Sequence, residues 1–100
     1  MKLIEISAIN ISSNRQRRLF DAASLHELAN SITQRGLYHP IVLRVVGEGY
    51  QLVSGERRLR AVQDIYGLGG SFSHDGEPVL EGCIPYTTLG ELDELAAEEA

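Results

Sequence analysis

The fold of this chain is organised around one run of residues, Tyr50-Gln51-Leu52-Val53-Ser54-Gly55-Glu56-Arg57-Arg58-Leu59-Arg60-Ala61. Its first half predicts a short strand, and its second half predicts a helix. Gly55 stands between the two, where a residue without a Cβ lets a ligand approach the backbone closely. The run therefore predicts a strand, a tight turn and a helix whose first turns carry arginines.

The start of this predicted helix has the features of an anion site. The first backbone N–H groups of a helix lack partners within the helix, and they lie at the positive end of its dipole. Arg57, Arg58 and Arg60 add planar guanidinium groups that match phosphate oxygens two at a time. We interpret the run as a phosphate-binding strand–turn–helix. Arginines that only solubilise an exposed helix are the alternative.

Length and composition favour one globular domain. The chain has 100 residues, 43% of them hydrophobic and 23% charged, which is ordinary for a single globular domain. No apolar run approaches the ~20 residues that span a bilayer, and the N-terminus lacks a signal-peptide pattern. Cys83 is the single cysteine, so we expect a small core residue, no disulfide and a cytoplasmic setting with no membrane partner. The three histidines lack the spacing of metal ligands, so no metal site of side chains is predicted.

Charge is distributed unevenly along the chain. Residues 1–74 contain all nine Lys and Arg and six acidic residues, for a net charge of +3. Residues 75–100 contain eight acidic residues and no Lys or Arg, for a net charge of −8. This asymmetry fits an anion-binding body followed by an acidic end, and a solvated acidic helix at residues 89–100 explains that end equally well.

The apolar pattern predicts further elements on both sides of the central run. Residues 3–6 predict a strand, and Ser24 with Glu27 predicts the capped start of a helix that ends near Gly36. Residues 40–46 predict a buried strand that joins the central run through a hairpin turn.

The second half of the chain carries weaker signals. Residues 67–78 are rich in glycine and serine, and we expect a mobile loop there. Residues 78–86 predict a weak strand. The order of elements predicts an α+β domain, a small mixed sheet with packed helices.

Three stretches resemble the N-terminal domain of ParB-type partition proteins, within the ParB/sulfiredoxin fold. They are residues 25–32, residues 36–44 (Gly-Leu-Tyr-His-Pro-Ile-Val-Leu-Arg) and residues 54–61, which resemble the family's Gly-Glu-Arg-Arg-x-Arg-Ala signature. The likeness covers residues 3–66 well and residues 79–100 loosely. It implies the ParB N-terminal, sulfiredoxin-like fold.

The resemblance also implies a function. It implies a CTP-binding domain, working with Mg²⁺, in a DNA-associated partition or regulatory protein whose nucleotide switches self-association and DNA binding. The residues that it carries over to the phosphates are Gly55, Glu56, Arg57 and Arg58. Those that it carries over to the vicinity of the nucleoside are Gly36, His39 and Pro40.

The chain departs from the family pattern at three places. Residues 67–78 look like an insertion relative to the family's common short turn. His39 stands where the family usually has glutamine, and the later Glu-Asn-x-x-Arg segment that helps to hold Mg²⁺ and phosphate is absent. We therefore expect residues 1–100 to be a single domain that is a fragment of a longer chain. DNA is an expected partner of the full-length protein, and a homodimer is a candidate assembly.

Two other functions stay open at this point. An enzyme of the same fold, either a ParB-like nuclease or a phosphoryl-transfer enzyme, would use Glu56 as its catalytic carboxylate. Glu56 can instead favour the helix dipole or pair with Arg60 one turn later. A plain DNA-binding module would use both arginine clusters, the arginines of the central helix and the cluster Arg15, Arg17 and Arg18; the latter also suits a solubilising loop. Sulfiredoxin chemistry is not expected, since residues 54–58 contain no cysteine.

Overall fold

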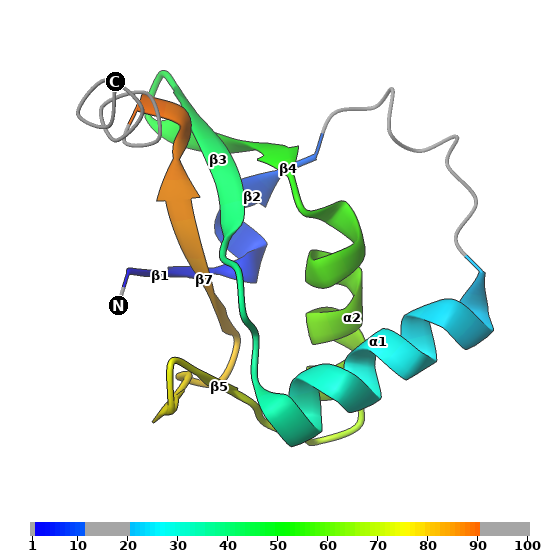
Figure 1. Cartoon of the computed structure of the whole chain (residues 1–100). Coiled ribbons are helices and arrows are strands. Elements are labelled where there is room, and N and C mark those ends of the chain that lie inside the picture. The colour runs from blue at the N-terminus through cyan, green and yellow to red at the C-terminus, as the bar shows by residue number, and fades with distance from the viewer. Residues whose placement is uncertain (1, 12–20, 91–100) are drawn as a thin grey trace, which may run out of the picture.

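Helix α2 (Glu56–Gly67) packs on one face of a mixed, five-stranded sheet, and helix α1 (Ala22–Arg35) packs against α2 (Figure 1). The structure is a computed structural model, and it describes residues 2–11 and 21–90. The sheet has the strand order β1-β7-β3-β4-β2. Its strands are β1 (Leu3–Glu5), β2 (Ile9–Asn10), β3 (Ile41–Val46), β4 (Gly49–Ser54) and β7 (Cys83–Thr88). The other elements are a short 3-10 helix η1 (Ile6–Ala8) and a separate hairpin of β5 (Ser73–His74) and β6 (Glu77–Pro78).

The sheet combines both strand directions. β3 pairs antiparallel with β4 and parallel with β7, while β1 is antiparallel to β7 and β2 is parallel to β4. The predicted hairpin between β3 and β4 turns at Gly47, whose φ of 60° suits a residue without a side chain. The prediction of an α+β domain with a small mixed sheet is confirmed.

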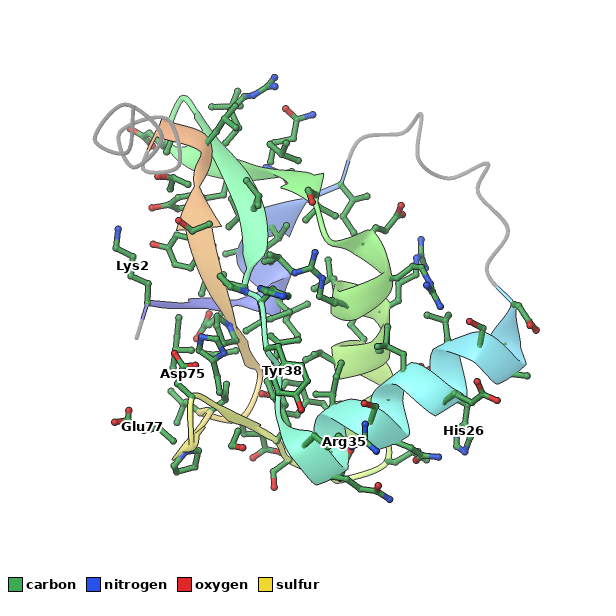
Figure 2. The ribbon with its side chains drawn as sticks, in the orientation of Figure 1. Lys2, His26, Arg35, Tyr38, Asp75 and Glu77 are labelled. Atoms are coloured by element: carbon green, nitrogen blue, oxygen red, sulfur yellow. The ribbon has the colours of Figure 1, made fainter. Side chains whose placement is uncertain are left out.

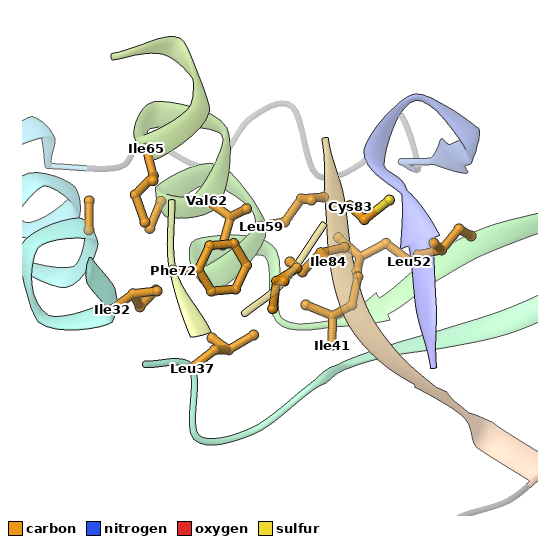
Figure 3. Packing of buried hydrophobic residues seen from close by; sticks show 14 of the residues in the cluster. Ile32, Leu37, Ile41, Leu52, Leu59, Val62, Ile65, Phe72, Cys83 and Ile84 are labelled. Atoms are coloured by element: carbon orange, nitrogen blue, oxygen red, sulfur yellow. The ribbon is translucent and has the colours of Figure 1, made fainter. Parts of the chain in front are cut away.

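The core lies between the sheet and α2. Along β3 the side chains of Ile41 and Leu43 are fully buried, because alternate residues of a strand face the same side of the sheet. Leu59 and Val62 of α2 are also fully buried and pack toward the sheet (Figure 3). Cys83 is buried within the same cluster, as expected of a small core residue.

Helix α1 begins earlier than the sequence pattern indicates. Asp21 caps it, and its carboxylate accepts a hydrogen bond from the backbone N–H of Ala23 at 3.2 Å. The prediction that Ser24 is the N-cap is therefore wrong: both residue types suit a cap, and Asp21 takes the position three residues earlier. The helix ends at Gly36, with φ of 88°, as predicted.

The segment after α2 differs from the expected loop. Residues 73–78 form the β5–β6 hairpin, and Phe72, which precedes it, is buried in the core. The backbone N–H of Val79 donates to the carbonyl of Phe72 at 3.1 Å, which ties the two ends of the hairpin together. Glycine and serine content predicted a loop here, but one buried aromatic residue anchors the segment to the core.

Two predicted features fall outside the described residues. The basic cluster Arg15, Arg17 and Arg18 lies there, and so does nearly all of the acidic helix expected at residues 89–100. The strand expected at residues 78–86 is present as β7, shifted toward the C-terminus to Cys83–Thr88.

Tyr66 ties α2 to the chain that enters β7, and we expect it to make stability depend on alkaline pH. Its hydroxyl donates to the Cys83 carbonyl at 2.7 Å and lies 3.1 Å from that of Leu80. Burial, together with the neighbouring Cys83, raises the pKa of Tyr66. Because the unfolded chain loses this proton near pH ~10, before the folded chain does, the free energy of unfolding should fall above that pH. Tyr66→Phe should make this decline shallower and cost about 1 kcal/mol at neutral pH.

Urea unfolding at neutral pH and above pH ~10 measures both effects. Tyr38→Phe is the matched control, since Tyr38 is 66% exposed. It should change neither the free energy of unfolding at neutral pH nor its decline at alkaline pH. Tyr86, whose pKa is raised by its hydrogen bond with the Tyr50 side chain, accounts for the decline that remains in the variant. If the free energy of unfolding of Tyr66→Phe fell with alkaline pH as steeply as that of the original chain, Tyr66 would not be the cause of the decline.

Candidate functional site

The predicted strand–turn–helix is present. β4 ends at Ser54, Gly55 makes the turn with φ of 101°, and α2 begins at Glu56. A Cβ on Gly55 would lie 2.8 Å from Cγ2 of Ile41, closer than a real Cβ approaches another atom, and 3.3 Å from Cα of the same residue. The backbone of the turn therefore rests directly on the first residue of β3, which fixes where the N-terminus of α2 lies.

An open hollow of about 590 Å³ lies at the start of α2. The residues that line it are Leu28, Val53, Ser54, Gly55, Glu56, Arg57 and Arg58. All four residues predicted to contact phosphate are in this set. The hollow thus combines the positive end of a helix with two guanidinium groups, an arrangement suited to a polyanion.

Arg57 connects the first turns of the two helices. Its Nη2 donates to the hydroxyl oxygen of Ser24 at 2.6 Å. Ser24 lies in the first turn of α1, so this hydrogen bond brings the N-terminal ends of α1 and α2 together at one edge of the hollow. The sequence does not indicate this role of Ser24, because no local pattern connects two residues that are 33 positions apart.

Arg58 connects α2 to the segment that leads into β3. Its Nη1 donates to the carbonyl oxygens of His39 at 3.0 Å and Pro40 at 2.9 Å. A guanidinium has five N–H donors in a fixed plane, so one group can hold this segment and also face an anion. Arg58 therefore joins the predicted phosphate residues to the predicted nucleoside residues.

A second hollow, of about 180 Å³, adjoins the first. Its lining residues are Leu28, Ser31, Ile32, Gly36, Leu37, Tyr38, His39 and Arg58, of which Leu28 and Arg58 also line the first hollow. Two of the residues predicted near the nucleoside, Gly36 and His39, are therefore brought to it. Pro40 lines a different hollow, on the side of Lys2 and Tyr86, and meets the site through its carbonyl group alone.

Glu56 is enclosed, although it is charged. The residue is 4% exposed, and its Oε1 accepts from Nη2 of Arg60 at 3.3 Å, which confirms the expected pair one helical turn apart. A buried carboxylate of this kind is held by its cationic neighbour. Its catalytic role stays a prediction.

The described residues contain neither a metal-binding cluster nor a membrane-spanning helix. In residues 2–11 and 21–90, no three His, Cys, Asp or Glu side chains are placed to hold a metal ion. In the same part of the chain, no helix combines the length and apolar character needed to cross a membrane.

The sequence matches a known domain family. The sequence model of the ParB N-terminal domain matches residues 1–67. A probable chromosome-partitioning protein ParB of Coxiella burnetii is 44% identical over 63 residues, which are 63% of this chain and 22% of that protein. The chromosome-partitioning protein Spo0J of Thermus thermophilus is 43% identical over 58 residues, 58% of this chain and 22% of that protein. The chain thus spans about a fifth of the length of these relatives.

Solved structures resemble the fold. C-terminally truncated ParB from Caulobacter crescentus, complexed with CTP-gamma-S, superimposes with a TM-score of 0.62 and 29% identity over 87% of this chain and 42% of that chain. The same protein, complexed to the centromeric parS site, superimposes with a TM-score of 0.65 and 31% identity. The match covers 99% of this chain and 45% of that chain. Sulfiredoxin from Arabidopsis thaliana superimposes with a TM-score of 0.60 and 25% identity. The match covers 94% of this chain and 96% of that chain. The predicted resemblance and its fold are therefore confirmed.

The contact between Gly55 and Ile41 predicts an unusually costly alanine substitution. Gly69→Ala is the matched control, because Gly69 has φ of 77° but no atom within 4 Å of an added Cβ. We expect Gly69→Ala to cost ~1–2 kcal/mol for its positive φ alone. Gly55→Ala should cost a further ~1–3 kcal/mol because the methyl group overlaps Ile41. Urea unfolding of both variants measures the difference, and equal costs would contradict the close contact.

Proposed function

The chain belongs to the ParB N-terminal domain family, and on this basis we propose that it is the nucleotide-binding domain of a DNA-associated partition or regulatory protein. We further propose that its nucleotide is CTP, with the triphosphate at the start of α2 and the nucleoside toward residues 36–39.

One observation carries this proposal: the two hollows adjoin at Leu28 and Arg58. The larger one has the chemistry of a phosphate site, with the N-terminus of α2, Gly55 and Arg57. The smaller one is enclosed by α1 and by the segment from Gly36 to His39. A nucleotide has the same division into a polyanionic end and a less polar ring, so it can occupy both hollows at once.

The choice of CTP rests on a relative. The Caulobacter crescentus protein was crystallised with CTP-gamma-S and shares the fold of this chain at 29% identity. The chemistry of the hollows supports a nucleoside triphosphate, whereas the base is proposed by analogy with that protein.

Magnesium would enter with the nucleotide. Mg²⁺ is usually held by one or two carboxylates together with substrate phosphates. Glu56 is the carboxylate that lines the larger hollow, and it already pairs with Arg60. The described residues therefore fit an ion that is bound mainly by the phosphates.

We also propose that the nucleotide switches self-association and DNA binding of the whole protein. One solved relative is a complex with the centromeric parS site, and the curated relatives are partition proteins. Arg57 and Arg58 link the nucleotide site to α1 and to β3, so an anion that draws on these donors can change how three elements are held. Coupling of this kind is reciprocal: DNA that favours one state of the protein also changes its nucleotide affinity.

Thermal unfolding with CTP, ATP and GTP, each at millimolar concentration with Mg²⁺, tests the proposed ligand. A nucleotide at about 100 times its dissociation constant stabilises the folded state by about 2.7 kcal/mol, which gives a visible rise in melting temperature. We expect this rise with CTP, and we expect Arg57→Ala to remove it because it takes a cation from the phosphate side.

The matched control is Arg44→Ala. Arg44 is an exposed arginine of β3 that lines neither hollow, so its variant should respond to CTP as the original chain does. Equal losses in the two variants would indicate a nonspecific charge effect. Absence of any rise with all three nucleotides would overturn the proposed function.

A further inference from the structure

The β5–β6 hairpin holds the segment that lines the smaller hollow. The backbone N–H of Leu37 donates to the carbonyl of Ser73 at 2.8 Å. Nδ1 of His74 lies 2.6 Å from the carbonyl oxygen of Leu37, and Leu37 and His74 also form an isolated parallel bridge. Both backbone polar groups of Leu37 are therefore bound by the hairpin, whose strand β5 lies near the end of α1 (Figure 1).

This contact is tight and anchored. A Cβ on Gly36 would lie 2.9 Å from the carbonyl oxygen of Ser73, so the two backbones meet without space for a side chain. Leu37 is buried on one side of the contact, and Phe72 is buried immediately before the hairpin on the other. Phe72 also packs against Tyr66 of α2, with ring centroids 5.8 Å apart. The hairpin is thus fixed to the core and can hold residues 36–37 in one position.

His74 supplies the side-chain part of this contact. Its side chain is 12% exposed, and Nε2 lies 3.5 Å from the carboxylate of Asp75. Because a carbonyl oxygen can only accept, Nδ1 must carry a proton, and it does so in both the charged ring and one neutral tautomer. Lys2, Asp75 and Glu77 line the hollow beside His74, on the same side of the molecule (Figure 2). Asp75 faces Nε2, at the opposite side of the ring from the Leu37 contact, and that contact itself requires only the proton on Nδ1.

We propose that His74 is a positioning residue that fixes the nucleoside-side wall of the site and thereby sets which base this chain accepts. The inference rests on the proposed function, because the smaller hollow must receive the nucleoside. Gly36, Leu37 and His39 all line that hollow, and the hairpin holds the backbone at the centre of this set. When residues 36–39 are already held in the conformation that binds the nucleoside, binding does not lose free energy to ordering them. A rigid segment also excludes a base whose shape does not fit the hollow.

Three variants of His74 separate the donor from the bulk of the ring. His74→Asn keeps an N–H donor at nearly the position of Nδ1, because both nitrogens are bonded to Cγ. His74→Leu removes the donor and keeps an apolar side chain of similar size. His74→Gln keeps a donor but places it one bond farther from the backbone, so it replaces the leucine variant should that variant unfold.

The experiment is calorimetric titration of the full chain with CTP, UTP, ATP and GTP in Mg²⁺, well below the melting temperature of each variant. We expect His74→Leu, and likewise His74→Gln, to weaken CTP binding about tenfold and to narrow the preference for CTP over ATP. His74→Asn should retain both affinity and preference. In the nucleotide-free chain, hydrogen exchange of the Leu37 amide should be faster in the leucine variant and slow in the asparagine variant.

The outcomes distinguish the two proposals. If the original chain binds none of the four nucleotides, the proposed function falls and the role of His74 falls with it. If it binds CTP selectively and His74→Leu does the same, only the role of His74 is overturned. A purely structural role would lower the melting temperature while leaving the ratio of CTP to ATP affinity unchanged, and that result also overturns the proposal.

Discussion

The contact of the Gly55 backbone with Ile41 is the constraint on which the site depends. It places the end of β4 against the start of β3, so α2 must begin beside the segment that leads into β3. From this start α2 packs Leu59 and Val62 into the core. One close approach of the Gly55 backbone to Ile41 therefore positions both the buried face of the helix and its exposed, positively polarised end.

The three arginines of α2 each connect to a different part of the protein. Arg57 reaches Ser24 of α1, Arg58 reaches the carbonyls before β3, and Arg60 pairs with Glu56 within α2. Three like charges within two turns repel one another, and the positive end of a helix adds to this repulsion. A polyanion bound at the proposed site would offset the repulsion, so the same residues that hold the elements together would also make them responsive to a phosphate ligand.

Local sequence predicts well the structure of the proposed phosphate side of this site. The strand, the Gly55 turn and the arginine helix follow one another without interruption, and Gly36 ends α1 as its neighbours indicate. Contacts between distant residues were not predictable in this way. Ser24 was interpreted as a cap because its local pattern fits one, but Asp21 takes that position and the Ser24 hydroxyl binds Arg57. The local composition of residues 67–78 predicts a loop. The β5–β6 hairpin there is ordered by the buried Phe72 and by the contact with Leu37, which local composition does not reveal.

The two halves of the site therefore differ in how the sequence encodes them. The phosphate side is built from consecutive residues, so a short signature suffices to specify a site for a polyanion. The nucleoside side is built where α1, the segment before β3 and the β5–β6 hairpin meet, and Leu37 and His74 are 37 positions apart. If the nucleoside occupies the smaller hollow as proposed, base preference depends on the shape of that second wall, to which the signature contributes only Arg58. The proposal therefore predicts that two members of the family with the same signature bind phosphate alike and differ in base preference, according to what packs against the residues that follow α1.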